Sequence, residues 1–289
     1  MWASQNKLGK GYVIASTYVS IAITLLIFSV LFCYSFQAFK EIGWRLFTHN
    51  WNPATEEYGI LPMLYGTLSV TCIALLIAVP IGVLTAIFTS EIVPKQYRLY
   101  IKSAIELLAG IPSIVYGLIG IAFFSTWISS WFDLASGRTL LTAGILLAIM
   151  ILPTIITLSD DALFNIPKKY KEASKGLGFY SYEVIQKTIW PIAKKNIAGA
   201  ILLALGRALG ETMAVMLLVG SIDKIPDPFY KVISPGQTIT SKLGREVGES
   251  AFGSLHFSAL NAIGFILLLL VITLTVFTQI YFRKKQEVL

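Results

Sequence analysis

One apolar segment of the sequence carries two charged residues of opposite sign. The stretch Asn196–Ile222 is interrupted only by Arg207 and Glu211, which are four residues apart. In a continuous helix this spacing places both side chains on one face. The planar guanidinium of an arginine can donate paired hydrogen bonds to an oxyanion, and a nearby carboxylate could orient it. The alternative is a structural ion pair that locks two helices together, and both interpretations remain open.

A second group of polar residues surrounds a proline. Glu106 precedes the segment Gly110-Ile111-Pro112-Ser113, and Tyr116 follows it. The proline predicts a kink in a helix. Backbone carbonyls freed inside a membrane must face a cavity or another polar group. Ser113 and Tyr116 could supply hydroxyls to such a cavity, although a kink that serves packing alone would explain the same residues.

The composition indicates that these residues belong to a membrane protein. Of the 289 residues, 55% are hydrophobic and 13% are charged, whereas soluble domains carry about 25% charged residues. Six apolar stretches are long enough for the ~20 residues that cross a bilayer. We therefore predict an all-α polytopic fold. It forms a single transmembrane domain over residues 1–289, with helices at about 13–36, 64–89, 104–128, 140–158, 197–220 and 258–282.

The basic residues predict how the chain is oriented. With the N-terminus in the cytoplasm, 15 of the 23 Lys and Arg residues lie inside and 7 outside, and Arg207 lies within the membrane. This bias favours cytoplasmic positions for both termini and for the loop 159–195. The outer loops 37–63 and 221–257 could dock an external partner or only connect helices. The net charge of +7 does not indicate nucleic acid, because the basic residues flank apolar segments instead of forming one stripe.

The inner loop 159–195 contains the signals of a short helix. Pro167 suits a first helical turn and Gly178 suits a helix end. We predict a helix near 167–177, followed by a second one through 182–187. A helix that points away from the membrane can fit a groove in a partner and transmit a push. A basic interfacial helix that binds anionic lipid would partly explain the four lysines between residues 168 and 175.

The spacing within this loop resembles the "EAA" signature of bacterial ABC import permeases. Glu172-Ala173-Ser174 is followed by Gly178 and by Ile189-Trp190-Pro191. The signature has a second Ala where Ser174 stands, an Ile at Thr188 and a Leu at Trp190. The resemblance implies the type I, MetI-like importer fold and a coupling helix that docks on an ATP-hydrolysing subunit. The coupling residues that it implies are Tyr170, Glu172, Ala173, Ser174 and Gly178.

Three further stretches are similar to the phosphate-specific transport permeases. They are residues 106–117, residues 206–215, and Tyr58-Gly59-Ile60-Leu61-Pro62 with Gly66-Thr67-Leu68, which favours the PstC type over its PstA sibling. The resemblance implies phosphate import across the bacterial inner membrane. It also implies partners in a PstA-type permease, a pair of PstB-type ATPases and a PstS-type external binding protein, besides the lipid bilayer. The predicted translocation residues are Arg207, Glu211, Thr212, Ser113 and Glu106.

Several other function classes lack support in the sequence. There is no Gly-x-x-x-x-Gly-Lys-Ser/Thr segment, so ATP and Mg²⁺ are expected in the partner and not as cofactors of this chain. We predict no catalytic residues and no metal site, since no His/Cys cluster has ligand spacing. Sulfate, molybdate or another oxyanion is the alternative cargo. An ion-coupled secondary transporter is less favoured, because it predicts inverted repeats and more buried acids. A structural scaffold would leave the Arg207–Glu211 pair unexplained beyond packing.

Overall fold

The computed structural model describes residues 2–284 and confirms an all-α membrane fold. Within these residues, six helical segments are long and apolar enough to cross a membrane. Lys285, one of the basic residues used to orient the chain, lies outside the described residues. The six segments are Gly9–Glu41, Leu61–Ile92, Ser113–Phe132, Leu140–Phe164, Ser181–Gly210 and Leu255–Phe277.

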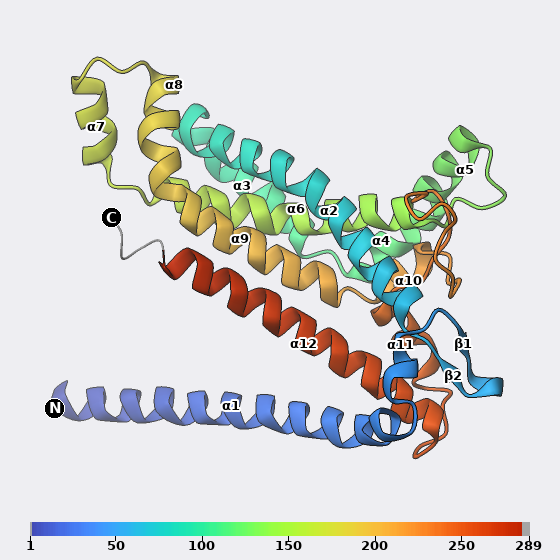
Figure 1. Cartoon of the computed structure of the whole chain (residues 1–289). Coiled ribbons are helices and arrows are strands. Elements are labelled where there is room, and N and C mark those ends of the chain that lie inside the picture. The colour runs from blue at the N-terminus through green and yellow to red at the C-terminus, as the bar shows by residue number, and fades with distance from the viewer. Residues whose placement is uncertain (1, 285–289) are drawn as a thin grey trace.

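Helix α6 (Leu140–Phe164) is the central element of the bundle. In the apolar part of this helix 67% of the residues are buried within the structure, whereas in the span nearest the N-terminus only 6% are. Helices α2 (Leu61–Ile87) and α9 (Trp190–Gly210) pack along it (Figure 1). A small residue permits the close approach of α2, because a Cβ on Gly144 would lie 2.6 Å from Cγ2 of Ile73. Such glycine contacts let membrane helices approach at the level of the backbone.

A second, smaller core joins the first and the last helix next to the hairpin. The later part of helix α1 (Trp2–Glu41) packs against the first part of α12 (Leu255–Lys284), and the two helices diverge from there (Figure 1). Ser258 fastens them, since its Oγ accepts from the Ala38 amide at 2.9 Å and donates to the Tyr34 carbonyl at 2.6 Å. Most of α1 is exposed within this chain. Its apolar surface is therefore available to lipid or to another subunit.

The two ends of the bundle carry different structures. The start of α1, the described end of α12 and helix α7 (Lys168–Gly176) lie at one end in Figure 1. The opposite end carries helix α5 (Thr126–Phe132) and a small hairpin. In that hairpin, β1 (Trp51–Asn52) pairs antiparallel with β2 (Glu57–Tyr58). Helix α7 and both described ends of the chain thus share one side of the bundle.

The third span differs from the predicted helix 104–128. Residues 95–109 form a separate amphipathic helix, α3 (Lys95–Ala109), and the third span begins only at α4 (Ser113–Ile119). The span continues through a π-helical turn into α5. Pro112 does not kink a helix. It precedes α4 with φ −58° and ψ 139°, an extended conformation that ends one helix and starts the next.

The fifth span also differs from prediction, at both ends. It begins early, because α8 (Ser181–Glu183) and a π-helical turn lead directly into α9. It then ends at Gly210 instead of continuing to residue 220. A separate short helix, α10 (Met213–Leu218), follows the break. Later in the chain, α11 (Ile239–Glu246) precedes the last span.

Candidate functional site

Arg207 and Glu211 lie on either side of the break in the fifth span. Arg207 is in the last turn of α9, whereas Glu211 has left the helix, with φ −68° and ψ 127°. The prediction that both side chains share one helix face is therefore wrong. Among the described residues, no ion pair joins the two side chains. Each of them has a different partner.

Arg207 faces an open groove of the chain. Its Nη1 donates to Oγ1 of Thr154 on α6 at 3.1 Å. The groove has a volume of about 580 Å³ and is also lined by residues of α9 and α12. A Cβ on Gly206 or Gly210 would meet no atom of this chain within 4 Å. The glycine-containing side of α9 next to Arg207, which carries no side chain at these two positions, is thus accessible to a ligand or to another subunit.

Glu211 and Thr212 shape the break itself. Oε1 of Glu211 accepts from the Ala214 amide at 3.3 Å, in the first turn of α10. Its backbone carbonyl accepts from Oγ1 of Thr240 at 2.7 Å, which ties the break to α11. Thr212 Oγ1 donates to the Gly210 carbonyl at 3.2 Å. A carboxylate at this position satisfies an amide that the short helix leaves unpaired.

The other two predicted translocation residues, Ser113 and Glu106, lie on two different helices. Ser113 is the first residue of α4, and α4 packs against α10 so closely that a Cβ on Gly117 would lie 3.1 Å from Cα of Ala214. Ser113 is thus on a helix that contacts the broken segment. Glu106 lies on α3, outside the third span, which corrects its predicted position. It was misplaced because α3 and α4 were predicted as one helix.

Helix α7 confirms the predicted short helix in the inner loop. Pro167 precedes it, and Gly178 ends it with φ +84°, a left-handed conformation that favours glycine. Ser174 is buried against the following π-helical turn, where its hydroxyl lies 2.8 Å from that of Thr188. Glu172, Ala173 and Tyr170 are exposed. One face of α7 therefore packs against the following π-helical turn, and the opposite face is exposed and could contact a partner.

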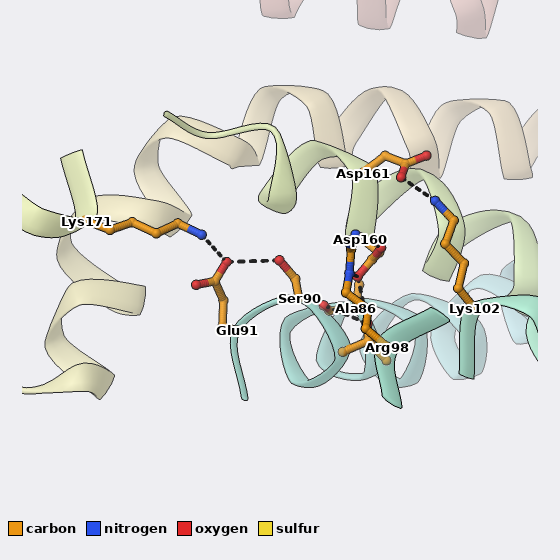
Figure 2. A network of polar contacts seen from close by, with 9 residues as sticks. Ala86, Ser90, Glu91, Arg98, Lys102, Asp160, Asp161 and Lys171 are labelled. Atoms are coloured by element: carbon orange, nitrogen blue, oxygen red, sulfur yellow. Dashed lines mark hydrogen bonds and ion pairs between the residues drawn. The ribbon is translucent and has the colours of Figure 1, made fainter. Parts of the chain in front are cut away.

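A polar network connects α7 to three other elements (Figure 2). Nζ of Lys171 on α7 lies 2.6 Å from Oε1 of Glu91, in the π-helical turn after α2. Asp160 on α6 accepts from Oγ1 of Thr89 at 2.9 Å and pairs with Arg98 of α3 at 2.5 Å. The side chain of Asp160 is only 4% exposed. This network fixes the positions of α3, α6 and α7 relative to the end of α2.

The sequence also contains a signal for this network. Asp160 and Asp161 stand at the end of an otherwise uncharged span, and Arg98 and Lys102 are four residues apart on one segment. The structure matches the two sets, with Lys102 Nζ 2.5 Å from Oδ1 of Asp161. Two acids entering a membrane segment require partners. A pair of cations at helical spacing is the natural candidate for them.

Comparisons with known proteins decide the family. The model of the family "Binding-protein-dependent transport system inner membrane component" matches residues 78–286. The protein named "Phosphate transport system permease protein PstC" of Mesorhizobium japonicum is 39% identical over 257 residues, which cover 82% of this chain and 77% of that protein. The chain belongs to this family of transport permeases. It is accordingly a multi-pass inner-membrane protein.

Solved structures of permeases share the fold. A bacterial ABC transporter involved in the import of alginate matches with a TM-score of 0.64 at 14% identity, over 96% of this chain and 98% of that one. The MetNI methionine ABC transporter, in an inward-facing conformation, matches with a TM-score of 0.57 at 18% identity, over 78% and 94%. The permease thus has the predicted MetI-like fold of type I importers.

A buried lysine at the opposite end of the permease was not predicted. Lys242 on α11 was counted among the outer-loop charges, yet it is only 3% exposed. Its Nζ lies 2.5 Å from Asp223 and 2.6 Å from Glu246, and 5.1 Å from the centre of the Trp51 ring. Tyr58 packs on that ring, and burial, together with the charge of Glu56, raises the pKa of its hydroxyl. The lysine thereby connects the hairpin loop to α11.

The described residues of the permease contain no group of three His, Cys, Asp or Glu side chains that could hold a metal ion. Around the break, the predicted translocation residues supply one guanidinium, a carboxylate that caps α10 and a hydroxyl. Such a site can bind and release an anion.

Proposed function

We propose that the chain is the channel-forming permease of an ATP-driven importer of inorganic phosphate, working by alternating access. The observation that carries the proposal is the guanidinium of Arg207, which has no carboxylate partner among the described residues and faces an open groove at a broken helix. A cation within a span is costly unless it meets protein, water or a counter-ion. An oxyanion supplies that counter-ion with matching geometry.

The names of the relatives support phosphate as the cargo. Proteins from Mesorhizobium japonicum, Pasteurella multocida and Haemophilus influenzae, at 39%, 38% and 33% identity, carry the name of a phosphate transport system permease. The break at residues 211–212 gives the transport cycle a hinge. Helix α10 and the end of α9 can turn relative to each other there without breaking regular helical hydrogen bonds.

The expected partners follow from the exposed surfaces and the family. A PstB-type ATPase, which binds ATP and Mg²⁺, would receive the exposed face of α7 on the cytoplasmic side. A PstA-type permease would complete the path beside the glycine-containing side of α9, and a PstS-type protein would deliver phosphate to the outer end. This arrangement requires both termini in the cytoplasm. It needs no cofactor and no catalytic residue of this chain.

Phosphate uptake by the intact complex tests the proposal. Arg207→Gln should abolish uptake, because an amide cannot neutralise the anion. Arg207→Lys should retain part of it, since the charge stays but the paired hydrogen bonds are lost. Arg45→Gln is the matched control, because Arg45 is exposed on a 3-10 turn outside the site. Undiminished uptake by Arg207→Gln at normal expression would overturn the anion role.

The cargo and the energy source can be separated in the same assay. Sulfate and molybdate are the alternative oxyanions, and each should fail to compete with phosphate for uptake. Competition at equal concentration would assign the permease to the broader oxyanion class. Uptake that persists without ATP would favour an ion-coupled secondary transporter instead.

A further inference from the structure

A hollowed surface lies at the end of α10 that is farther from the broken turn. One hollow of about 410 Å³ is lined by Arg138, Arg245, Ser221 and residues at the end of α10. A neighbouring hollow of about 460 Å³ shares Arg138 and Gly220 with it and adds Lys231. We infer that these two hollows, here called the outer basin, bind the transported oxyanion before it reaches Arg207. This inference rests on the proposed function and adds a second binding site to it.

The fold places the basin next to the break in the fifth span. Helix α11 packs on the break, since Thr240 donates to the Glu211 carbonyl at 2.7 Å. A Cβ on Gly244 would lie 2.9 Å from Cγ2 of Thr212. Arg245 directly follows that contact. The basin and the break therefore lie at the two ends of α10, whose six residues span about 9 Å.

The charges of the basin are uncompensated. In the part of the chain that the structure describes, the guanidinium groups of Arg138 and Arg245 have no hydrogen bond or ion pair. The neighbouring carboxylates Asp223 and Glu246 are both bound to buried Lys242. Lys242 and Arg245 thus lie on the same helix with opposite environments. Two free guanidinium groups lining one hollow match an oxyanion, which can accept several hydrogen bonds at once.

The backbone of the basin is held in an uncommon conformation. Gly220 and Ser221 both have positive φ angles, +92° and +58°. A left-handed serine is uncommon and needs support from its surroundings. That support comes from Gly236, which accepts from the Ile222 amide at 3.1 Å and donates to the Val219 carbonyl at 2.8 Å. The turn that carries Ser221 into the hollow is therefore a built feature and not a loose loop.

Protection from an arginine reagent tests binding directly. The intact complex in nanodiscs of phosphatidylcholine is treated with phenylglyoxal, and the modified arginines are measured by mass spectrometry. Inorganic phosphate at about ten times its dissociation constant should slow modification of Arg138 and Arg245 about tenfold, because only the unoccupied basin reacts. Exposed Arg45 should react at an unchanged rate. Equal rates with and without phosphate at the basin arginines would overturn the proposal.

Other occupants give different results in the same experiment. Protection that appears only when anionic phosphatidylglycerol is added would assign the basin to a lipid headgroup. Protection by the phosphate-free external binding protein alone would make it a docking surface for that protein. Either outcome overturns the proposal of a site for the transported anion.

Transport by the Arg138→Gln/Arg245→Gln variant gives the second test. Phosphate uptake at low phosphate and low salt should fall about tenfold, because the local anion concentration falls. ATP hydrolysis stimulated by the binding protein should stay near that of the parent, as it should for the Arg45→Gln control. Parental uptake by the double variant would overturn the basin alone. A parent complex that does not carry phosphate at all would instead overturn the proposed function.

Discussion

The basic residues near α7 and the arginines from the broken turn outward differ in their partners, whereas buried Lys242 at the outer end is paired like the first group. At the end that carries α7, the basic residues Arg98, Lys102 and Lys171 each pair with a carboxylate at 2.5–2.6 Å. From the broken turn to the opposite end, Arg207, Arg138 and Arg245 have no carboxylate partner among the described residues. Paired charges fix elements relative to one another. Unpaired charges are left for an anion that arrives from outside.

The largest loss of stability is expected for the most buried of these ion pairs, Arg98–Asp160. Asp160→Ala should destabilise the permease by about 3 kcal/mol, because Arg98, whose side chain is only 16% exposed, loses its carboxylate partner. Thermal unfolding of the purified complex measures the effect. Asp161→Ala is the matched control and should cost at most about 1 kcal/mol, since the Asp161 side chain is 45% exposed. Equal losses for the two variants would show that burial does not distinguish the two ion pairs.

The link between α7 and the end of α2 predicts a loss of coupling. Lys171→Glu places two carboxylates together where an ion pair at 2.6 Å now joins two elements. Phosphate uptake should fall about tenfold, the effect of a coupling energy near 1.4 kcal/mol, while ATP hydrolysis continues. The reversed pair Lys171→Glu/Glu91→Lys should restore much of the uptake.

A control variant distinguishes loss of the Lys171–Glu91 contact from a general effect of the changed charge on α7. Lys168→Glu changes the same charge on the same helix without a partner at the end of α2. It should leave uptake near the parental level. If Lys168→Glu also loses uptake, or if the reversed pair does not restore it, coupling does not depend on the Lys171–Glu91 contact.

The end of α7 depends on one backbone conformation. Gly178→Ala should cost about 1–2 kcal/mol, because φ +84° is unfavourable for a residue with a Cβ. The loss should appear as weaker co-purification of the ATPase with the permease. Gly176→Ala is the control, since Gly176 lies in α7 and a Cβ there would meet nothing within 4 Å. Gly178→Pro should disrupt docking still further, and an intact, transporting complex would show that this turn does not position α7.

These differences also show what the sequence could and could not predict. The six spans, helix α7 and its glycine end were predictable, since long uncharged runs and Pro/Gly boundaries are local signals. The two broken helices were not. Arg207 and Glu211 have ideal helical spacing, but a tertiary bond from Thr240 to the Glu211 carbonyl and the cap of Glu211 on the Ala214 amide stabilise the open segment. In the same way, α3 was joined to α4 because Pro112 was taken for a kink.

The smallest expected effect concerns two of the three departures from the coupling signature. Ser174 and Thr188 stand where the signature has Ala and Ile, and their hydroxyls lie 2.8 Å apart. Each hydroxyl therefore provides the hydrogen-bond partner of the other. Ser174→Ala alone should cost about 1 kcal/mol in thermal unfolding, since the Thr188 hydroxyl loses its partner next to a buried position. The double variant Ser174→Ala/Thr188→Ile should cost less than the sum, because an apolar pair leaves no polar group unsatisfied. Additive losses in this cycle would show that the two side chains are not energetically coupled.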